Sequence, residues 1–213
     1  MSTAEKVQTR PSRRERQREE TRRDLAQIAL ELASERGLAN VRVPEIAAAA
    51  GVSTRTFNNY FPSKEAAIAW PTVGRWTRMV ENLLARPAEE PVGEALVAAI
   101  GELYVPAPGA DPDRDADPED SFIGRFRALA AAEPSLRVEY LRISDAGEDQ
   151  LAKGIAARIG AGEDELRPRL LAAMAVGAER AAIRHWIGTK NQTTPLADIV
   201  DAAVREALKE VDR

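Results

Sequence analysis

The chain has 213 residues, among them 30 Lys and Arg, 34 Asp and Glu, a single histidine and no cysteine. The lack of cysteine excludes a disulfide scaffold, thiolate chemistry and cysteine-ligated metal, and this length suffices for one or two domains with a sizeable core. No signal-peptide pattern opens the chain and no apolar stretch reaches the roughly 18 residues of a membrane span, so we expect a cytoplasmic protein.

Positive charge is concentrated near the N-terminus. Residues 1–64 contain 12 Lys and Arg against 8 Asp and Glu, a net charge of +4, whereas residues 65–213 contain 18 against 26, a net charge of −8. Seven arginines lie close together: Arg10, Arg13, Arg14, Arg16, Arg18, Arg22 and Arg23. A basic end on an acidic body orients a protein toward a polyanion such as nucleic acid. The alternative, which the sequence leaves open, is a solvated tail or a helix face balanced by Glu15, Glu19 and Glu20.

Residues 1–18 are expected to form a disordered basic arm, followed by a helix from about Glu19, or earlier, to Arg36. The inward stripe of this helix consists of Leu25, Ile28, Ala29, Leu32 and Ala33. Gly37 can end the helix in a left-handed conformation that costs glycine least. Two capping boxes compete for its start, Ser12 with Glu15 and Thr21 with Asp24, so the sequence leaves its first residue open.

Residues 43–62 predict two short helices separated by a turn. Pro44 suits the first turn of the first helix. The apolar face of that helix consists of Ile46, Ala47 and Ala50. Gly51 follows at the position where a left-handed C-cap favours glycine. Ser53 can then cap the second helix.

The second short helix has an inner and an outer side. Phe57, with Tyr60 or Phe61 three and four residues later, can hold it on the core. Its outer side carries one fixed charge and several groups that both donate and accept hydrogen bonds: Thr54, Arg55, Thr56, Asn58 and Asn59. Such side chains read base edges and grip phosphates. The pattern predicts a three-helix, helix-turn-helix DNA-binding domain over residues 19–66.

Residues 21–64 resemble the N-terminal domain of TetR-type transcriptional regulators. The matching segments are Ile28–Leu32, Glu35–Gly37, Ile46–Ser53, Thr56–Phe57 and Tyr60–Lys64. This chain has Arg42 where the family often has Thr or Ser, and Asn58 where it often has an aromatic residue. The pattern and the resemblance together assign DNA binding to Arg18, Thr21, Arg22, Arg42, Ser53, Thr54, Arg55, Thr56, Asn58, Asn59, Tyr60 and Lys64. Thr21 and Lys64 are expected near helix starts, where free N–H groups attract phosphate.

The rest of the chain also has helical periodicity, so the fold class is all-α with about nine helices. The expected helices span about residues 63–86, with a kink or break near Pro71, then 91–104, 119–132, 135–159, 164–188 and 194–211, the last capped by Thr194. Residues 106–118 are acidic and Pro-rich, which indicates a connector rather than a calcium site. Residues 67–213 are expected to form a larger helical domain for ligand binding and dimerisation.

The last two expected helices indicate a dimer interface. Small residues on the first and a wide apolar stripe on the second would let two chains form a four-helix contact. The expected interface residues are Gly177, Ala178, Ala181, Ala182, Leu196, Val200, Ala203, Val204 and Ala207. The alternative is that both stripes are buried within one chain. A palindromic DNA site needs a two-fold symmetric protein, which favours the dimer.

Aromatic and methionine side chains of the second domain suit an apolar or flat ligand. The candidate ligand-binding residues are Trp70, Trp76, Met79, Phe122, Phe126, Tyr140, Ile143, Met174, Arg180, Ile183 and Trp186. The alternative is that they form ordinary core. Residues 126–186 are loosely similar to the C-terminal region of actinobacterial relatives, some of which respond to acyl-CoA thioesters, so the resemblance implies an apolar or acyl-CoA-like effector.

The main hypothesis is a homodimeric repressor that a small apolar or amphipathic molecule releases from a palindromic operator. The alternative is a ligand-independent, architectural DNA-binding protein. An enzyme is disfavoured, because the sequence contains no His pair, no Gly-rich phosphate loop and no Glu-x-x-His metal pattern. No cofactor and no metal are expected.

Overall fold

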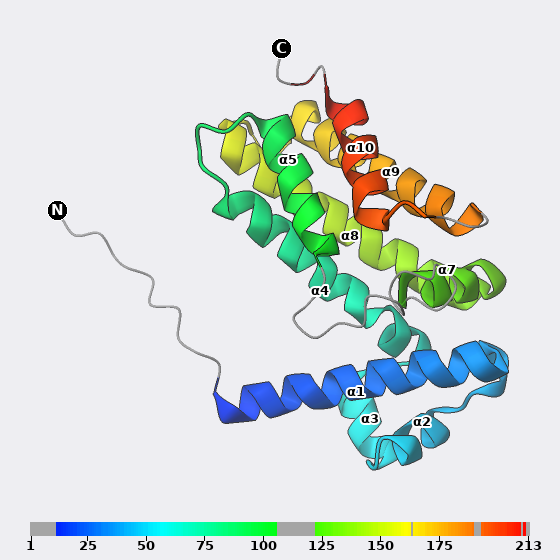
Figure 1. Ribbon diagram of the computed structural model, residues 1–213. Helices are drawn as coiled ribbons and strands as arrows, with labels where there is room; N and C mark the ends of the chain where they lie inside the picture. Colours follow the sequence, from blue (N-terminus) through cyan, green and yellow to red (C-terminus); the bar gives the residue numbers. More distant parts are fainter. Residues whose placement is uncertain (1–11, 106–121, 163, 190–192, 210, 212–213) are drawn as a thin grey trace. The chain divides into compact units, whose positions relative to one another are not determined.

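The computed structural model describes residues 12–105, 122–162, 164–189, 193–209 and 211. Within these ranges the chain forms nine α-helices and two short 3-10 helices, with no strand (Figure 1). The chain divides into two compact units, Met1–Ile68 and Ala69–Arg213. The all-α fold class is therefore confirmed.

Helix α1 spans Arg13–Arg36 and starts before Glu19. A capping box begins it: Ser12 N donates to Glu15 Oε2 at 2.6 Å, and Glu15 N donates to Ser12 Oγ at 3.2 Å. The prediction of a disordered arm is wrong for residues 13–18, because this box satisfies N–H groups at the helix start that would otherwise lack a partner. Residues 1–11, the rest of that predicted arm, lie outside the described residues. At the other end Gly37, with φ of +78°, terminates α1 as expected.

The first unit is completed by short helices. A 3-10 turn over Leu38–Asn40 leads into α2, Val43–Ala49, and α3, Thr54–Tyr60. The core between α1 and these elements is built from fully buried side chains, the largest of which are Phe57, Leu25, Leu30, Leu38 and Ile46. Both short helices and the inward position of Phe57 are thereby confirmed.

Helix α4 spans Lys64–Ala85 and crosses the boundary between the two units. Ser63 caps it as predicted, since Ala66 N donates to Ser63 Oγ at 3.1 Å. The helix continues through Pro71, so the predicted break there is wrong. Proline removes a single N–H donor, and α4 has apolar neighbours fixed on both sides of that position, including the fully buried Ile68 and Met79.

The second unit contains the other helices. These are α5 (Val92–Gly101, extended by a 3-10 turn over Glu102–Tyr104), α7 (Phe122–Ala132), α8 (Pro134–Ile159), α9 (Leu166–Gly188) and α10 (Leu196–Leu208). Proline opens α8 at its first turn, and Gly160 in the left-handed conformation closes it. The N-cap of α10 is Pro195 rather than the predicted Thr194, because Pro195 is the last residue with extended backbone (ψ 143°). The predicted connector, residues 106–118, lies outside the described residues.

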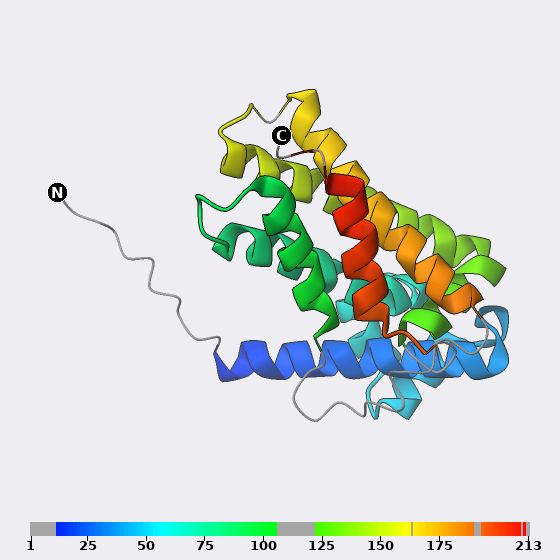
Figure 2. The ribbon, with the colours of Figure 1, turned by 45° about the horizontal axis from the view of Figure 1, so that its top comes forward.

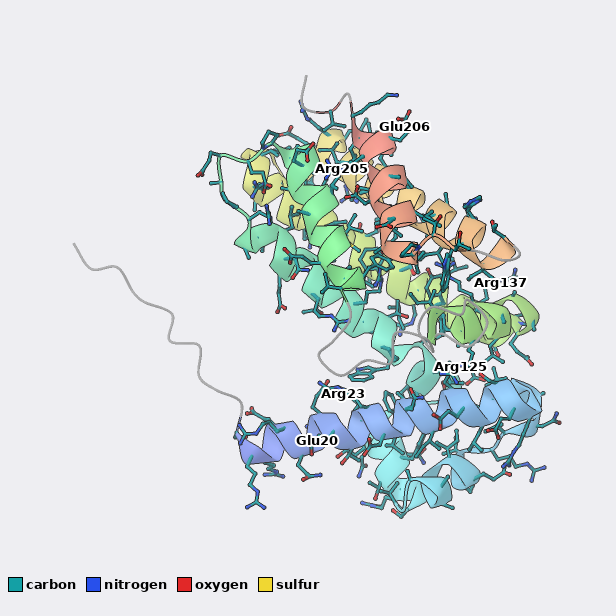
Figure 3. The ribbon with its side chains drawn as sticks, viewed as in Figure 1. Glu20, Arg23, Arg125, Arg137, Arg205 and Glu206 are labelled. Carbon is teal, nitrogen blue, oxygen red and sulfur yellow. The ribbon has the colours of Figure 1, made fainter. Side chains whose placement is uncertain are left out.

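Helix α10 packs along α9 and α5 within the same chain. Figures 1 and 2 show α10 running beside α9 in both views. Its apolar stripe, Val200, Val204 and Leu208, is at most 3% exposed. On its polar side, Arg205 (labelled in Figure 3) donates to Glu94 of α5 at 2.8 Å and to Asp201 at 2.9 Å. The second unit therefore covers most of the α10 stripe by itself.

Candidate nucleic-acid interface and a buried polar cluster

The turn between α2 and α3 is held by backbone and side-chain hydrogen bonds. Gly51 adopts φ of +67°, and Val52 N donates to Ala47 O at 2.9 Å. Ser53 Oγ accepts from Thr56 N at 3.0 Å and so caps α3. A non-glycine residue is strained at the Gly51 backbone conformation, which explains why glycine stands between the two helices.

Helix α3 has a buried side and an exposed side, as the sequence predicted. Phe57 is fully buried, and its ring centroid lies 5.9 Å from that of Phe61. The N-cap residue Ser53 is exposed, and so are four residues of the helix: Thr54, Arg55, Asn58 and Asn59. Thr56 and Tyr60 are half-buried. One guanidinium and two amides therefore lie on a solvent-facing helix surface, the chemistry that forms paired hydrogen bonds with guanine and adenine edges.

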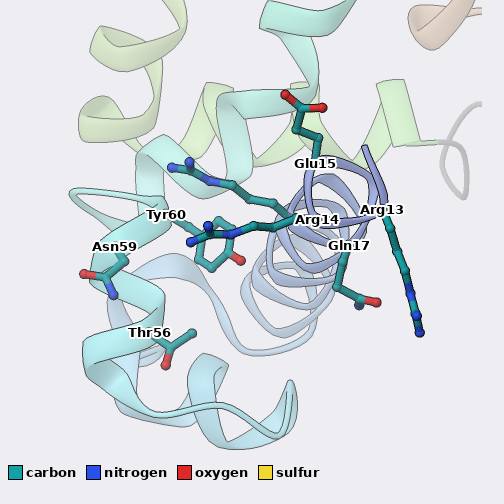
Figure 4. A pocket seen from close by; sticks show the side chains of 8 residues that line it. Arg13, Arg14, Glu15, Gln17, Thr56, Asn59 and Tyr60 are labelled. Atoms are coloured by element: carbon teal, nitrogen blue, oxygen red, sulfur yellow. The ribbon is translucent and has the colours of Figure 1, made fainter. Parts of the chain in front are cut away.

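A groove of about 910 Å³ lies between the N-terminal end of α1 and helix α3. It is lined by Arg13, Arg14, Glu15, Gln17 and Arg18 from α1 and by Thr56, Asn59 and Tyr60 from α3. Figure 4 shows these side chains on α1 and α3, with the Tyr60 ring between the two helices. Three arginines against one glutamate make the groove basic. The sequence analysis counted Arg13 and Arg14 in the basic arm rather than among the individual DNA contacts, and it did not single out Gln17.

Two α1 residues that the sequence assigned to DNA binding, Arg18 and Arg22, contact residues at the end of α3 within the chain. Arg22 donates from Nη2 to Tyr60 O at 3.4 Å, and its guanidinium carbon lies 5.4 Å from the Phe61 ring centroid. Arg18 lies 5.9 Å from the Tyr60 ring centroid. These contacts join α1 to the end of α3. Thr21 lies inside α1 rather than near its start, and its hydroxyl donates to Gln17 O at 3.0 Å.

Lys64 also has an internal role. Its ammonium donates to Leu38 O at 2.5 Å and to Val41 O at 2.8 Å, and the residue is half-buried. Two of its three N–H donors are thus engaged by the loop ahead of α2. Arg42, by contrast, is exposed at the N-cap of α2, where its backbone N–H donates to Glu45 Oε2 at 2.8 Å. The predicted phosphate contacts of Lys64 and Arg42 stay predictions.

Most of the predicted ligand-binding residues are buried in the second unit. Those at most 8% exposed are Trp76, Met79, Phe126, Ile143, Ile183 and Trp186. Trp70, Tyr140, Met174 and Arg180 are half-buried, and nothing is described for the Phe122 side chain. Arg180 lies 3.7 Å from Glu148 of α8. Burial alone fits core and cavity equally, so this assignment stays a prediction.

A buried polar cluster, which we define as Arg75, Tyr104 and Glu179, joins α4, the turn after α5, and α9. Glu179 is only 5% exposed, and its Oε1 accepts from the Arg75 guanidinium and, at 2.7 Å, from Tyr104 Oη. The Arg75 guanidinium also lies 4.5 Å from the Tyr104 ring centroid. The sequence reading missed this cluster, although Glu179 interrupts an otherwise apolar helix face, which was an available signal.

The charges of this cluster act on one another. Burial is the largest single effect on the pKa of Arg75 and lowers it. The charges of Glu179, Tyr104 and Tyr140, together with the hydrogen bond to Glu179, outweigh burial and raise that pKa. Burial and the Glu179 carboxylate raise the pKa of Tyr104 far above its ordinary value, against the opposing charges of Arg75 and Arg127. Arg127 in turn donates to Tyr140 Oη at 3.2 Å, and the Tyr140 ring centroid lies 5.5 Å from that of Phe126. The second unit therefore holds charged and aromatic side chains together in its interior.

The predicted dimer residues fall into two groups. Ala182, Val200 and Val204 are at most 3% exposed within the single chain. Their assignment to a surface between chains is therefore wrong, because packing among α5, α9 and α10 already covers them. Ala181 is exposed, and Gly177, Ala178, Leu196, Ala203 and Ala207 are half-buried. These six remain candidates.

The described residues contain neither a candidate metal site nor a helix suited to cross a membrane. No group of three or more His, Asp or Glu side chains in the described ranges is placed to hold a metal ion. Among the helices that the structure describes, none combines the length and the apolar character needed to cross a bilayer.

Known proteins match both units. The family model of bacterial regulatory proteins of the tetR family matches residues 27–68, and that of the MftR C-terminal domain matches residues 113–211. The HTH-type transcriptional regulator TcmR of Streptomyces glaucescens is 33% identical over 178 residues, 83% of this chain and 77% of that protein. MftR of Mycobacterium tuberculosis, whose name assigns it to mycofactocin biosynthesis regulation, is 25% identical over 194 residues, 90% of this chain and 91% of that protein.

Solved structures share the fold. A tetR-family transcriptional regulator from Streptomyces coelicolor superposes with a TM-score of 0.56 at 21% identity, covering 90% of this chain and 80% of that one. At this identity the likeness concerns the fold alone. Together, the matching family model and the 33% identity shared with TcmR show that this chain belongs to the TetR family of DNA-binding transcriptional regulators.

Proposed function

We propose that this regulator is a homodimeric repressor, released from a palindromic operator by a small amphipathic effector that binds the second unit. The observation that carries the proposal is the exposed surface of α3, where Arg55, Asn58 and Asn59 stand clear of the core. Two such helices from a symmetric dimer would enter successive major grooves about 34–36 Å apart.

The basic groove supports the DNA part of the proposal. Its arginines line the space beside α3, so a phosphate backbone that flanks the major groove contacted by α3 would meet Arg13, Arg14 and Arg18. Phosphate contacts of this kind position a protein and make its affinity salt-dependent, while base contacts supply the sequence preference.

The outer face of α9 supports the dimer. Leu166 and Leu170 are 75% and 52% exposed, and Gly177 and Ala181 recur on the same face at helical spacing. A Cβ placed on Gly177 would meet no atom within 4 Å in the single chain, so a neighbouring helix of a second chain has room to approach. Small residues permit such close approach of two helix backbones.

The experiment is footprinting on bound fragments recovered from genomic DNA, followed by salt titration of the affinity. The Arg14→Ala/Arg18→Ala variant should bind the same sequence with a slope of log affinity against log salt reduced by about two units. The matched control is Arg137→Ala, at an exposed arginine of α8. An unchanged slope for the double variant would remove the groove from the interface, and the absence of any footprint would contradict the proposed function.

A further inference from the structure

Helices α4, α8 and α9 contact one another in one layer of the second unit, around residues 75–76, 147–148 and 179–180, a layer that we refer to below as this level. Arg75 of α4 pairs with Glu179 of α9, and the next residue of each helix contacts α8: Trp76 lies against Gly147, and Arg180 lies 3.7 Å from Glu148. A Cβ on Gly147 would overlap the indole of Trp76, so that ring lies flat on the α8 backbone. Only glycine at residue 147 leaves room for the indole in this position.

Two buried polar groups at this level have no hydrogen-bond partner among the described residues. They are Nε1 of Trp76, a residue 7% exposed, and Oγ of Ser144, a residue 3% exposed, one helical turn before Gly147 on α8. Buried donors are almost always satisfied, and an unsatisfied one destabilises the folded chain. Alanine would fill the Ser144 position without that penalty, and packing of the Trp76 ring does not require its N–H, so neither polar group is explained by packing alone.

The charged side chains around these two groups include three arginines and two glutamates. Arg75 forms an ion pair with Glu179, and Arg180 lies 3.7 Å from Glu148, so these charges offset each other. Arg127 donates to the phenol of Tyr140 at 3.2 Å and forms no ion pair with the described residues, so its guanidinium is a positive charge without a carboxylate partner there. The apolar surface at this level is aromatic, with the rings of Trp76, Tyr104, Phe126 and Tyr140.

We propose that the effector is a planar, anionic aromatic molecule whose oxygen atoms accept hydrogen bonds from Trp76 Nε1 and Ser144 Oγ. Its ring system packs among the aromatic side chains, and its negative charge faces Arg127. This inference rests on the proposed function, because it names the chemistry of the effector that the second unit would recognise. A flexible fatty-acyl chain would not present the flat apolar surface that suits these aromatic rings.

The test uses 3-hydroxy-2-naphthoate as the probe and its neutral amide as the paired compound, in isothermal titration calorimetry on the full chain. Wild type should bind the carboxylate at least tenfold more tightly than the amide. Trp76→Phe and Ser144→Ala should each weaken carboxylate binding about tenfold, because each removes one hydrogen bond to a charged ligand. Ser144→Ala should unfold at the same temperature as wild type or higher, since it removes an unsatisfied buried group, whereas Trp76→Phe should lose some stability because the smaller ring leaves a cavity.

In Ser144→Ala, that combination separates recognition from a structural role, which would lower the unfolding temperature and leave the affinity unchanged. Thr77→Ala, at an exposed hydroxyl of α4, is the matched control and should bind as wild type does. The inference is overturned if wild type does not bind the carboxylate at millimolar concentration, if the amide binds equally, or if both variants bind unchanged. Tighter binding of lauroyl-CoA that is insensitive to Trp76→Phe would also overturn it.

Operator binding is measured on the same samples without probe. If the variants and wild type bind operator equally but the probe results fail, the effector chemistry is wrong and the repressor proposal stands. If wild type binds no operator, the proposed function fails, whatever the calorimetry shows.

Discussion

Lys64, the first residue of α4, donates from its ammonium to the carbonyl oxygen of Val41 at 2.8 Å. The same nitrogen donates to Leu38 O at 2.5 Å, so one side chain holds both ends of the segment that leads into α2. Leu38 and Val41 are themselves 1% and 2% exposed. The helix that crosses into the second unit thus also fixes the start of the helix-turn-helix.

Lys64→Met should therefore lower the free energy of unfolding by about 1.5–3 kcal/mol, because it removes charge-assisted hydrogen bonds and leaves two carbonyls short of a donor. Chemical denaturation measures this, with Arg42→Met, an exposed basic residue nearby, as the control. If Lys64 serves only a phosphate, unfolding will be unaffected and only the salt dependence of DNA binding will change.

Arg55→Ala should reduce sequence discrimination more than it reduces overall DNA affinity. The side chain is exposed in the first turn of α3, the position that approaches base edges, and a paired contact to guanine contributes about 1–3 kcal/mol of discrimination. Fluorescence anisotropy on operator and scrambled DNA gives both affinities. Equal discrimination by Arg55→Ala and wild type would exclude Arg55 from base readout.

The start of α1 should depend on pH. The backbone N–H of Ser12, followed by its side chain, lowers the pKa of Glu15. Because the folded-state pKa is below the ordinary value, the capping box contributes stability above the ordinary glutamate pKa and loses it as pH falls through the lower folded value. NMR titration of the Glu15 carboxyl measures this. Ser12→Ala keeps the backbone N–H and removes only the side chain, so it should return that pKa part of the way toward its ordinary value. An identical titration curve in the variant would exclude the Ser12 side chain as a cause of the shift.

Gly147→Ala should destabilise the second unit by roughly 1–3 kcal/mol or more, since its methyl group overlaps the Trp76 indole. Gly74→Ala provides the control, because a Cβ at this exposed helical glycine meets nothing within 4 Å and should stabilise the chain by about 0.5–1 kcal/mol. Thermal denaturation compares the two, and a Trp76→Leu change should restore part of the loss in Gly147→Ala. Two variants of equal stability would show that the indole moves freely.

Gly177→Leu should weaken the dimer while leaving the single chain stable. Within one chain a Cβ at residue 177 meets no atom within 4 Å, so we expect the overpacking to arise against the second chain, and the two-fold symmetry applies its cost of about 1–3 kcal/mol to both copies. Sedimentation velocity gives the dissociation constant. Val200→Glu is a contrasting variant that should unfold the chain, because Val200 is fully buried between helices. A Gly177→Leu dimer as tight as that of wild type would refute the α9 interface.

Local signals predicted much of the first unit. The glycine turn, the Ser53 cap and the apolar positions of α2 and α3 all lie within a few residues of the contacts that they make, so spacing sufficed. The start of α1 was different. Two capping boxes were compatible with the sequence, and the structure uses Ser12, where the extended helix also brings Arg18 against Tyr60.

In the second unit, sequence periodicity predicted helices and their apolar faces but not which elements pack against them. The α10 pattern predicted an apolar stripe correctly but could not say what covers it, and its buried residues Val200, Val204 and Leu208 pack within the chain, where α10 contacts α9 and α5. Glu179 and Arg75 are separated by 104 positions, so their pairing depends on the tertiary arrangement. The predicted lining residues accordingly omitted both members of the buried ion pair.

The most direct test of the central account is selection of bound sequences from a random DNA library by the purified protein. A homodimeric helix-turn-helix regulator should enrich one palindromic motif, with half-sites centred about one helical turn, roughly 10–10.5 base pairs, or a multiple of it apart. Arg55→Ala should change the preferred bases within each half-site but not the spacing. Enrichment of no inverted repeat, or of single half-sites with no preferred spacing, would contradict the account.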